Sequence, residues 1–122
     1  MNKYEAMYQF FSGFGIPAYV ETSVPPEADY PYLTYAPIDG DYMSGEVTML
    51  VNLWYWTDSE AEPNKKVREI AEAIGFGGTC VGFDGGMMWL KKGNPWAQSL
   101  ADEDPMIKRR YLNVDVEYIS MS

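Results

Sequence analysis

The chain has 122 residues, of which 47% are apolar and 16% aromatic, and this is the size and composition of one folded domain. Its net charge of −9 disfavours sequence-reading binding of nucleic acid and attachment to an anionic membrane. There is no histidine and only one cysteine, which excludes Ser-His and Cys-His catalysis, an internal disulfide and the usual soft ligands of a structural zinc site.

The first predicted element is a helix from Asn2 to about Ser12. Asn2 is a good N-cap, and Gly13 ends the helix. Spacings of three, one and three place four apolar or aromatic residues on one side: Tyr4, Met7, Tyr8 and Phe11. The segment lacks the basic region and long apolar core of a secretory signal, so we expect the protein to stay in the cytoplasm where it is made.

Two strands separated by a stiff loop are expected next. Ala18–Thr22 is a candidate short strand, and Val24–Asp29 (V-P-P-E-A-D) is an exposed candidate contact loop because its prolines fix φ and lack a donor. Tyr30–Ala36 is predicted as a strand with Pro31 at its start or at an edge. The acidic segment Pro37–Gly45 is predicted as a turn or hairpin tip.

The stretch Val47–Trp56 (V-T-M-L-V-N-L-W-Y-W) is the most apolar part of the chain. It has about half the length of a membrane-spanning helix, and its β-branched and aromatic residues favour a strand. Its odd positions form a wholly apolar face, whereas Thr48, Leu50, Asn52, Trp54 and Trp56 form a mixed face with aromatic residues at one end. We therefore predict a sheet strand that is largely apolar on both sides.

A second helix follows, with Asp58 or Ser59 as possible caps and Gly75 as its stop. Its apolar stripe is expected to cover one face of the sheet and consists of Val67, Ile70, Ala71 and Ile74.

The remainder of the chain is predicted to add three strands. Thr79–Phe83 and Met87–Lys91 form a hairpin that turns at residues 84–86, Gly93–Pro105 is a long loop, and Met106–Ile119 is a half-buried strand. The order α-β-β-α-β-β-β, with an optional further strand before the second helix, predicts a single α+β domain. Its sheet is mainly antiparallel, with the two helices packed on one face.

The acidic and basic clusters do not have the spacing of a metal site. Asp39–Asp41 and Asp102–Asp104 lack the pattern of a calcium loop, so we expect solvated charges or ion pairs at an interface and no bound metal or cofactor. Lys108–Arg110 is the only basic run and is interpreted as a set of salt-bridge partners. Cys80 is interpreted as a small buried apolar residue.

Several aromatic residues could form a cluster, namely Trp54, Tyr55, Trp56, Trp89 and Trp96. Such a cluster could stack a sugar or a base. Aromatic residues that alternate within strands are more often part of a core or of a protein interface, which is the interpretation we favour.

The region Tyr30–Gly75 resembles the small tail-terminator or tail-completion proteins of long-tailed bacteriophages and their prophage relatives. The resemblance is carried by Y-P-Y-L-T-Y, an acidic glycine-containing tip, G-E-V-T-M-L-V-N-L-W, and then T-D-S-E-A-E before a helix that ends I-A-E-A-I-G. It implies a non-enzymatic virion protein, assembled in the host bacterial cytoplasm. Such a protein forms a ring, typically hexameric, on the head-proximal end of the tail tube, where it ends tube growth and contacts the tube protein and the head connector.

Residues 1–64 hold ten acidic side chains and one basic one, whereas residues 65–122 hold eight of each. Combined with the resemblance, this asymmetry suggests that Asp39, Asp41 and Glu46 face a lumen through which DNA passes without specific binding. The residues expected at a subunit or tube interface are Trp54, Trp56, Trp96, Asp102, Glu103, Asp104, Lys108, Arg109 and Arg110. Two alternatives stay open: a head–tail connector or minor capsid component of the neck, and a small monomeric ligand-binding domain that uses the tryptophans.

Overall fold

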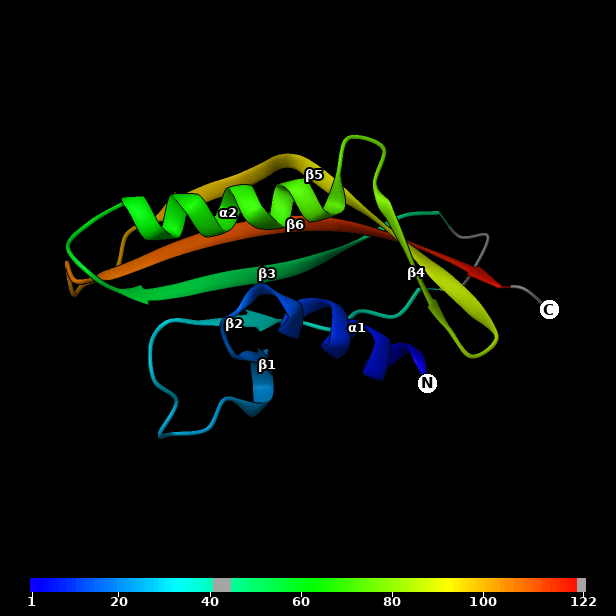
Figure 1. The fold of residues 1–122 in the computed structure, drawn as a ribbon, viewed down its shortest axis with the longest axis horizontal. Coiled ribbons are helices and arrows are strands. Elements are labelled where there is room, and N and C mark those ends of the chain that lie inside the picture. Colours follow the sequence, from blue (N-terminus) through cyan, green and yellow to red (C-terminus); the bar gives the residue numbers. More distant parts are fainter. Residues whose placement is uncertain (41–44, 121–122) are drawn as a thin grey trace.

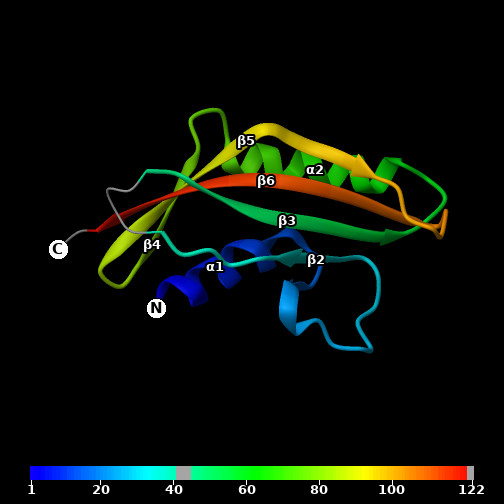
Figure 2. The same cartoon turned by 180° about the vertical axis from the view of Figure 1, so that it is seen from behind.

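The protein folds as one curled six-stranded sheet with two α-helices on one of its faces (Figures 1 and 2). The computed structural model describes residues 1–40 and 45–120. The strand order is β1-β2-β3-β6-β5-β4, in which β1 and β2 run parallel and all other neighbours run antiparallel. The elements are α1 (Lys3–Phe11), β1 (Ala18–Val20), β2 (Tyr32–Tyr35), β3 (Val47–Trp56), α2 (Ala61–Ile74), β4 (Thr79–Phe83), β5 (Gly86–Leu100) and β6 (Ile107–Ser120). The predicted α+β class is confirmed, and the optional further strand before α2 is present.

The N-terminal helix begins at a complete capping box. Asn2 Oδ1 accepts the Glu5 N–H at 2.9 Å, and the Glu5 carboxylate accepts the Asn2 N–H at 3.0 Å. Met7 and Phe11 are buried as the spacing predicted, but Tyr4 and Tyr8 are about half exposed. The buried stripe is turned toward Ala6, so both tyrosines lie at its solvent-facing edge, where their hydroxyl groups keep access to polar partners.

The pairing of β3 with β6 forms the centre of the sheet. It runs without interruption from Val47 opposite Val116 to Trp56 opposite Ile107. The odd positions of β3 and the even positions of β6 from Leu112 onward face the helices and form most of the core, as predicted. The helix α2 covers this face with Ile70 and Ile74.

The start of α2 differs slightly from the prediction. The N-cap residue is Glu60, whose side chain makes no capping hydrogen bond. Ser59, one of the two predicted caps, instead accepts the Ala61 N–H through Oγ at 3.1 Å.

The predicted loop over Gly93–Pro105 is wrong. Most of this segment continues β5 to Leu100, paired with β6 on either side of an irregularity between Lys92 and Ala97. The bulge removes Pro95, which has no N–H to donate, from the regular ladder. Gly93 is required beside it, because a Cβ atom there would lie 2.8 Å from Asn113 Cβ.

The interpretation of Cys80 as a buried residue is also wrong. Its side chain is exposed because it lies on the face of the sheet away from the helices, whereas Val81 and Phe83 of the same strand pack against the core. Cys80 lies opposite Trp89 of β5. Neither of the described helices has both the length and the apolar character needed to span a lipid bilayer.

The buried Tyr55 makes the stability of the fold sensitive to alkaline pH. Burial, and secondarily the carboxylates of Glu62 and Glu69, raise the pKa of Tyr55 to about 12, against about 10 in an unfolded chain. The neutral form stabilises the fold fully below pH ~10, and this contribution is lost as the pH rises toward ~12, because the unfolded chain ionises first.

We therefore expect the free energy of unfolding to fall less for Tyr55→Phe than for the wild type between about pH 9 and 12. The difference between the two losses should be about 1–3 kcal/mol. Urea unfolding at a series of pH values measures this difference. Tyr8→Phe, at an exposed position, is the matched control and should follow the wild type. Parallel pH profiles for Tyr55→Phe and the wild type would contradict the assignment.

Candidate interaction surface on the open face of the sheet

The face of the sheet opposite the helices is not covered by any described element (Figures 1 and 2). Even-numbered residues of β3 point to this open face, and their partners Thr34 and Tyr32 on β2 and Arg109 on β6 lie on it too. The strands contain 51 residues. At about 16 Å² per residue, the face is on the order of 800 Å², the area that each partner of a stable complex typically buries.

One end of the open face carries a continuous group of rings, which we call the aromatic surface: Tyr19, Tyr30, Tyr32, Trp54 and Trp56. Tyr32 is the central ring, 5.8 Å from Tyr19, 5.3 Å from Tyr30 and 6.3 Å from Trp54 between centroids. Tyr30 in turn lies 6.1 Å from Trp56. These spacings are those of favourable aromatic pairs.

Hydrogen bonds hold the centre of the aromatic surface in place. Trp54 Nε1 donates to Thr34 Oγ1 at 3.0 Å, and Arg109 Nε donates to Asn52 Oδ1 at 2.9 Å. The Arg109 guanidinium lies 4.7 Å from the centroid of a Trp54 ring, in cation–π contact. Burial, with smaller contributions from Tyr30 and Tyr19, raises the pKa of Tyr32. The aromatic surface therefore presents neutral rings beside one fixed cation.

The structure brings together only part of the aromatic cluster considered from the sequence. Trp54 and Trp56 belong to the aromatic surface, but Tyr55 points into the core. Trp89 lies opposite Glu117, eight residues along β6 from Arg109. Trp96 packs against the core from the bulge, and its buried Nε1 has no partner among the described residues.

Sequence reasoning missed the three tyrosines of the aromatic surface. Tyr30 and Tyr32 are two residues apart in the sequence, as Trp54 and Trp56 are, which was an available signal. Their contact depends on the antiparallel register that places Tyr32 opposite Trp54, and this register cannot be read from either segment alone.

The basic run has three different surroundings. Arg110, only 4% exposed, points to the helix side, where it contacts Glu60 at 2.5 Å and Asn64 at 3.1 Å. Lys108 donates to the Pro105 carbonyl, and Arg109 belongs to the open face. Of the three, Arg110 makes the salt bridge expected from the sequence.

The acidic turn between β5 and β6 forms local hydrogen bonds. Asp102 Oδ1 accepts the Asp104 N–H at 3.1 Å, Asp104 Oδ1 accepts the Met106 N–H at 2.9 Å, and Glu103 is exposed. Asp102 and Asp104, together with Lys108 and Arg110, lie among the lining residues of a surface cavity of about 420 Å³. The structure thus gathers four of the predicted interface residues at one end of the molecule.

Two of the three acids predicted to face a lumen, Asp39 and Glu46, form ion pairs within the chain. Asp39 contacts Lys3 at 2.5 Å and accepts the Tyr4 hydroxyl at 2.8 Å. Hydrogen bonds from Lys3 and Tyr4 lower the pKa of Asp39. Glu46 pairs with Lys91, and Asp41 lies outside the described residues. Their negative charge is therefore partly cancelled.

The described residues contain no group of three or more histidine, cysteine, aspartate or glutamate side chains placed to hold a metal ion. Comparison of the chain with known protein families, with curated proteins and with solved structures finds no significant match.

The two tryptophans of β3 should contribute differently to stability. Trp54 is half-buried and hydrogen-bonded, whereas Trp56 is 53% exposed. We expect Trp54→Ala to lower the free energy of unfolding by about 2–3 kcal/mol and Trp56→Ala by less than about 1 kcal/mol, measured by urea denaturation. A loss for Trp54→Ala of less than about 1 kcal/mol would show that Trp54 is not an integral part of the fold.

The pair formed by Arg110 and Glu60 should be strongly coupled because Arg110 is buried. A double-mutant cycle of Arg110→Met and Glu60→Gln should give a coupling energy of about 1–3 kcal/mol by urea unfolding. The comparison cycle of Lys66→Met and Glu69→Gln tests an i,i+3 pair at 2.9 Å on α2 whose cation is more exposed than Arg110, at 14% against 5%, and about 0.5 kcal/mol or less is expected for it. If the Arg110 cycle gave no more than the Lys66 cycle, burial would not strengthen this ion pair.

Proposed function

We propose that the protein is a non-enzymatic structural component of a bacteriophage tail. It assembles into a ring, expected to be hexameric, at the head-proximal end of the tail tube, where it ends tube growth and joins the tail to the head. The observation that carries the proposal is the open face of the sheet, which bears the aromatic surface and has no covering layer among the described residues. The resemblance of Tyr30–Gly75 to tail-terminator proteins supplies the class of assembly.

The aromatic surface has the properties of a protein interface. Tyrosine and tryptophan are enriched in the cores of interfaces because they bury large areas at low entropic cost. Thr34, Asn52 and Arg109 hold the central rings before any partner arrives, which reduces the ordering cost of association. A ring uses heterologous contacts, in which two different patches of each subunit meet. We assign the aromatic surface either to one of these two patches or to the contact with the tail tube.

The acidic character of the chain is compatible with DNA passing through the ring. Negative charge repels phosphate and therefore prevents tight binding to a lumen wall. Because Asp39 and Glu46 are each paired with a lysine, the repulsion at this end of the molecule is weaker than the sequence suggested.

A head–tail connector or minor capsid protein of the neck would use the same kind of surface. Electron microscopy of virions carrying the labelled protein separates these assignments, because a terminator lies on the tail side of the junction and a connector on the head side.

A second candidate function is a monomeric ligand-binding domain, which is favoured by the position of Arg109 over Trp54 beside exposed rings. It predicts a single subunit in solution and tryptophan fluorescence that changes on addition of small aromatic compounds or sugars. The ring proposal predicts no such response.

We expect the full chain to associate into closed rings, either alone at high concentration or when tail tubes present their ends. Analytical ultracentrifugation gives the mass, and negative-stain electron microscopy shows the rings. Trp56→Asp, which puts a charge on the aromatic surface without opening the core, should weaken assembly on tail tubes by about tenfold or more. A protein that stays monomeric at millimolar concentration and with tail tubes would refute the proposal.

A further inference from the structure

Phe76 is fully exposed, at 105% of the reference value for its side chain. It lies in the loop Gly75–Gly78 that joins α2 to β4. Burying a phenylalanine side chain is worth roughly 1.5–3 kcal/mol, and within the described chain Phe76 gains none of it. Such a residue is an available anchor for another surface.

The loop holds Phe76 in a defined position. Gly75 and Gly78 adopt φ values of 79° and 89°, which favour glycine. Trp89 Nε1 donates to the Gly77 carbonyl at 3.0 Å, and a Cβ atom on Gly78 would lie 2.6 Å from both Trp89 Nε1 and the Leu90 carbonyl oxygen. The loop therefore closes tightly against β5 and projects Phe76 outward.

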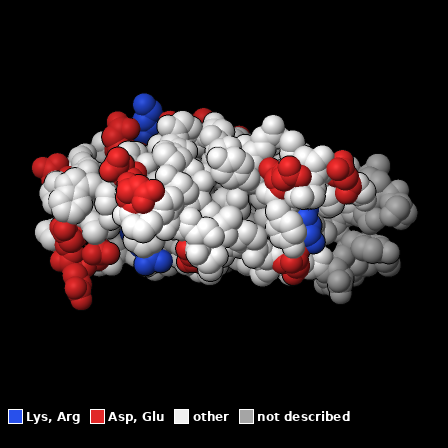
Figure 3. All heavy atoms as spheres, turned by 90° about the horizontal axis from the view of Figure 1, so that it is seen from below, with Lys and Arg blue, Asp and Glu red and all other residues white. Residues whose placement is uncertain are grey.

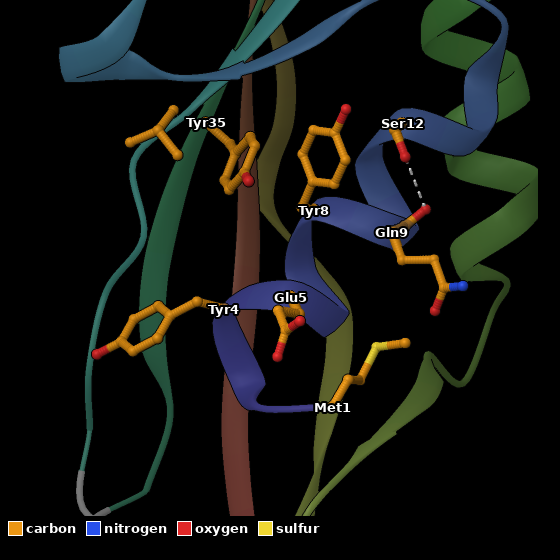
Figure 4. A pocket seen from close by; sticks show the side chains of 8 residues that line it. Met1, Tyr4, Glu5, Tyr8, Gln9, Ser12 and Tyr35 are labelled. Carbon is orange, nitrogen blue, oxygen red and sulfur yellow. Dashed lines mark hydrogen bonds between the residues drawn. The ribbon is translucent and has the colours of Figure 1, made fainter.

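An apolar groove lies beside the exposed edge of α1 (Figure 4). It has a volume of about 610 Å³, and its apolar and aromatic lining is Met1, Tyr4, Tyr8, Val20 and Tyr35, with Glu5 and Gln9 of α1 and the adjacent Ser12 along it. A dry cavity of about 150 Å³ already binds benzene, so the groove has room for a phenylalanine ring and its flanking backbone. Tyrosine rings and a methionine sulfur are favourable neighbours for such a ring.

The side of the molecule that carries α1 and β1 has little charge in its middle (Figure 3). Acidic groups gather toward its two ends, and a broad uncharged stretch separates them. Glu5 is the one lining residue of the groove with a charged side chain, so a phenylalanine ring that enters the groove displaces water from few charged groups, which keeps the desolvation cost low.

Phe76 and the α1 groove lie on opposite edges of the molecule. In Figure 1 the loop after α2 projects from the upper edge, whereas α1 lies along the lower edge. A subunit therefore cannot fill its own groove, and a contact between two copies uses different patches on each. A contact between two different patches can repeat from one copy to the next. The copies form a closed ring when the rotation between neighbours closes the circle.

We propose that Phe76 of one copy of this chain inserts into the α1 groove of the next copy and joins the subunits head to tail. The inference rests on the proposed function, because it assigns the contact between subunits of the ring. The aromatic surface is then left for the tail tube or the head connector.

Two complementary variants test the contact. Phe76→Asp removes the inserting phenylalanine ring and leaves the groove unchanged. Tyr8→Glu adds a charge to the groove and leaves Phe76 unchanged. Circular dichroism should show both folded, because both side chains are exposed. In analytical ultracentrifugation, with and without tail tubes, each variant alone should associate at least about tenfold more weakly than the wild type. Their equimolar mixture should form heterodimers and no larger species, and the control Phe76→Tyr should assemble.

Disulfide trapping gives an independent test in a Cys80→Ser background. A chain with Phe76→Cys and a second chain with Tyr8→Cys should form a mixed disulfide on mild oxidation, whereas Phe76→Cys with Leu50→Cys, on the open face, should not. If Phe76→Asp assembles as the wild type does, the contact is refuted and the ring proposal stands. If the wild type never assembles, with or without tubes, both proposals fail.

Discussion

The ten-residue antiparallel pairing between β3 and β6 is the constraint on which the rest of the structure depends. Side chains alternate across a sheet, so one register decides which residues are buried and which face outward. The observed register places Met49, Val51 and Leu53 under the helices. Their partners on β6 also point to the helix side. A slip of one residue would turn Asn52 and Trp54 toward the helices and turn the core residues away from them, and the apolar face of α2 would lose its partner.

The same register creates the aromatic surface. It leaves the even positions of β3 on the side without helices, and the β2 pairing adds Tyr32 next to Trp54. The polar groups between the rings bond to one another, as Arg109 does to Asn52. This surface is therefore ordered by the fold itself, and an ordered aromatic surface of this extent is better suited to a lasting protein contact than to transient exposure.

Charge and apolar surface are divided between different parts of the molecule. Ion pairs that involve Asp39 and Glu46 lie away from the aromatic surface, and the uncharged middle of the α1 side separates acidic groups at its two ends. Phe76 and the α1 groove add two complementary apolar features on opposite edges. Several different patches on one small subunit suit an assembly in which each subunit meets more than one neighbour.

The sequence by itself determined the α+β class, the helix capped by Asn2, the hairpin whose turn lies within the predicted residues 84–86, and the buried faces of β3 and β6. These depend on caps, glycines and alternation, which are local signals. Only the tertiary structure decided that β5 continues through Pro95, that Cys80 is exposed and that Tyr19, Tyr30 and Tyr32 join Trp54. Each of these depends on strand order and register, and pairing between residues distant in the chain leaves no periodic pattern within either segment.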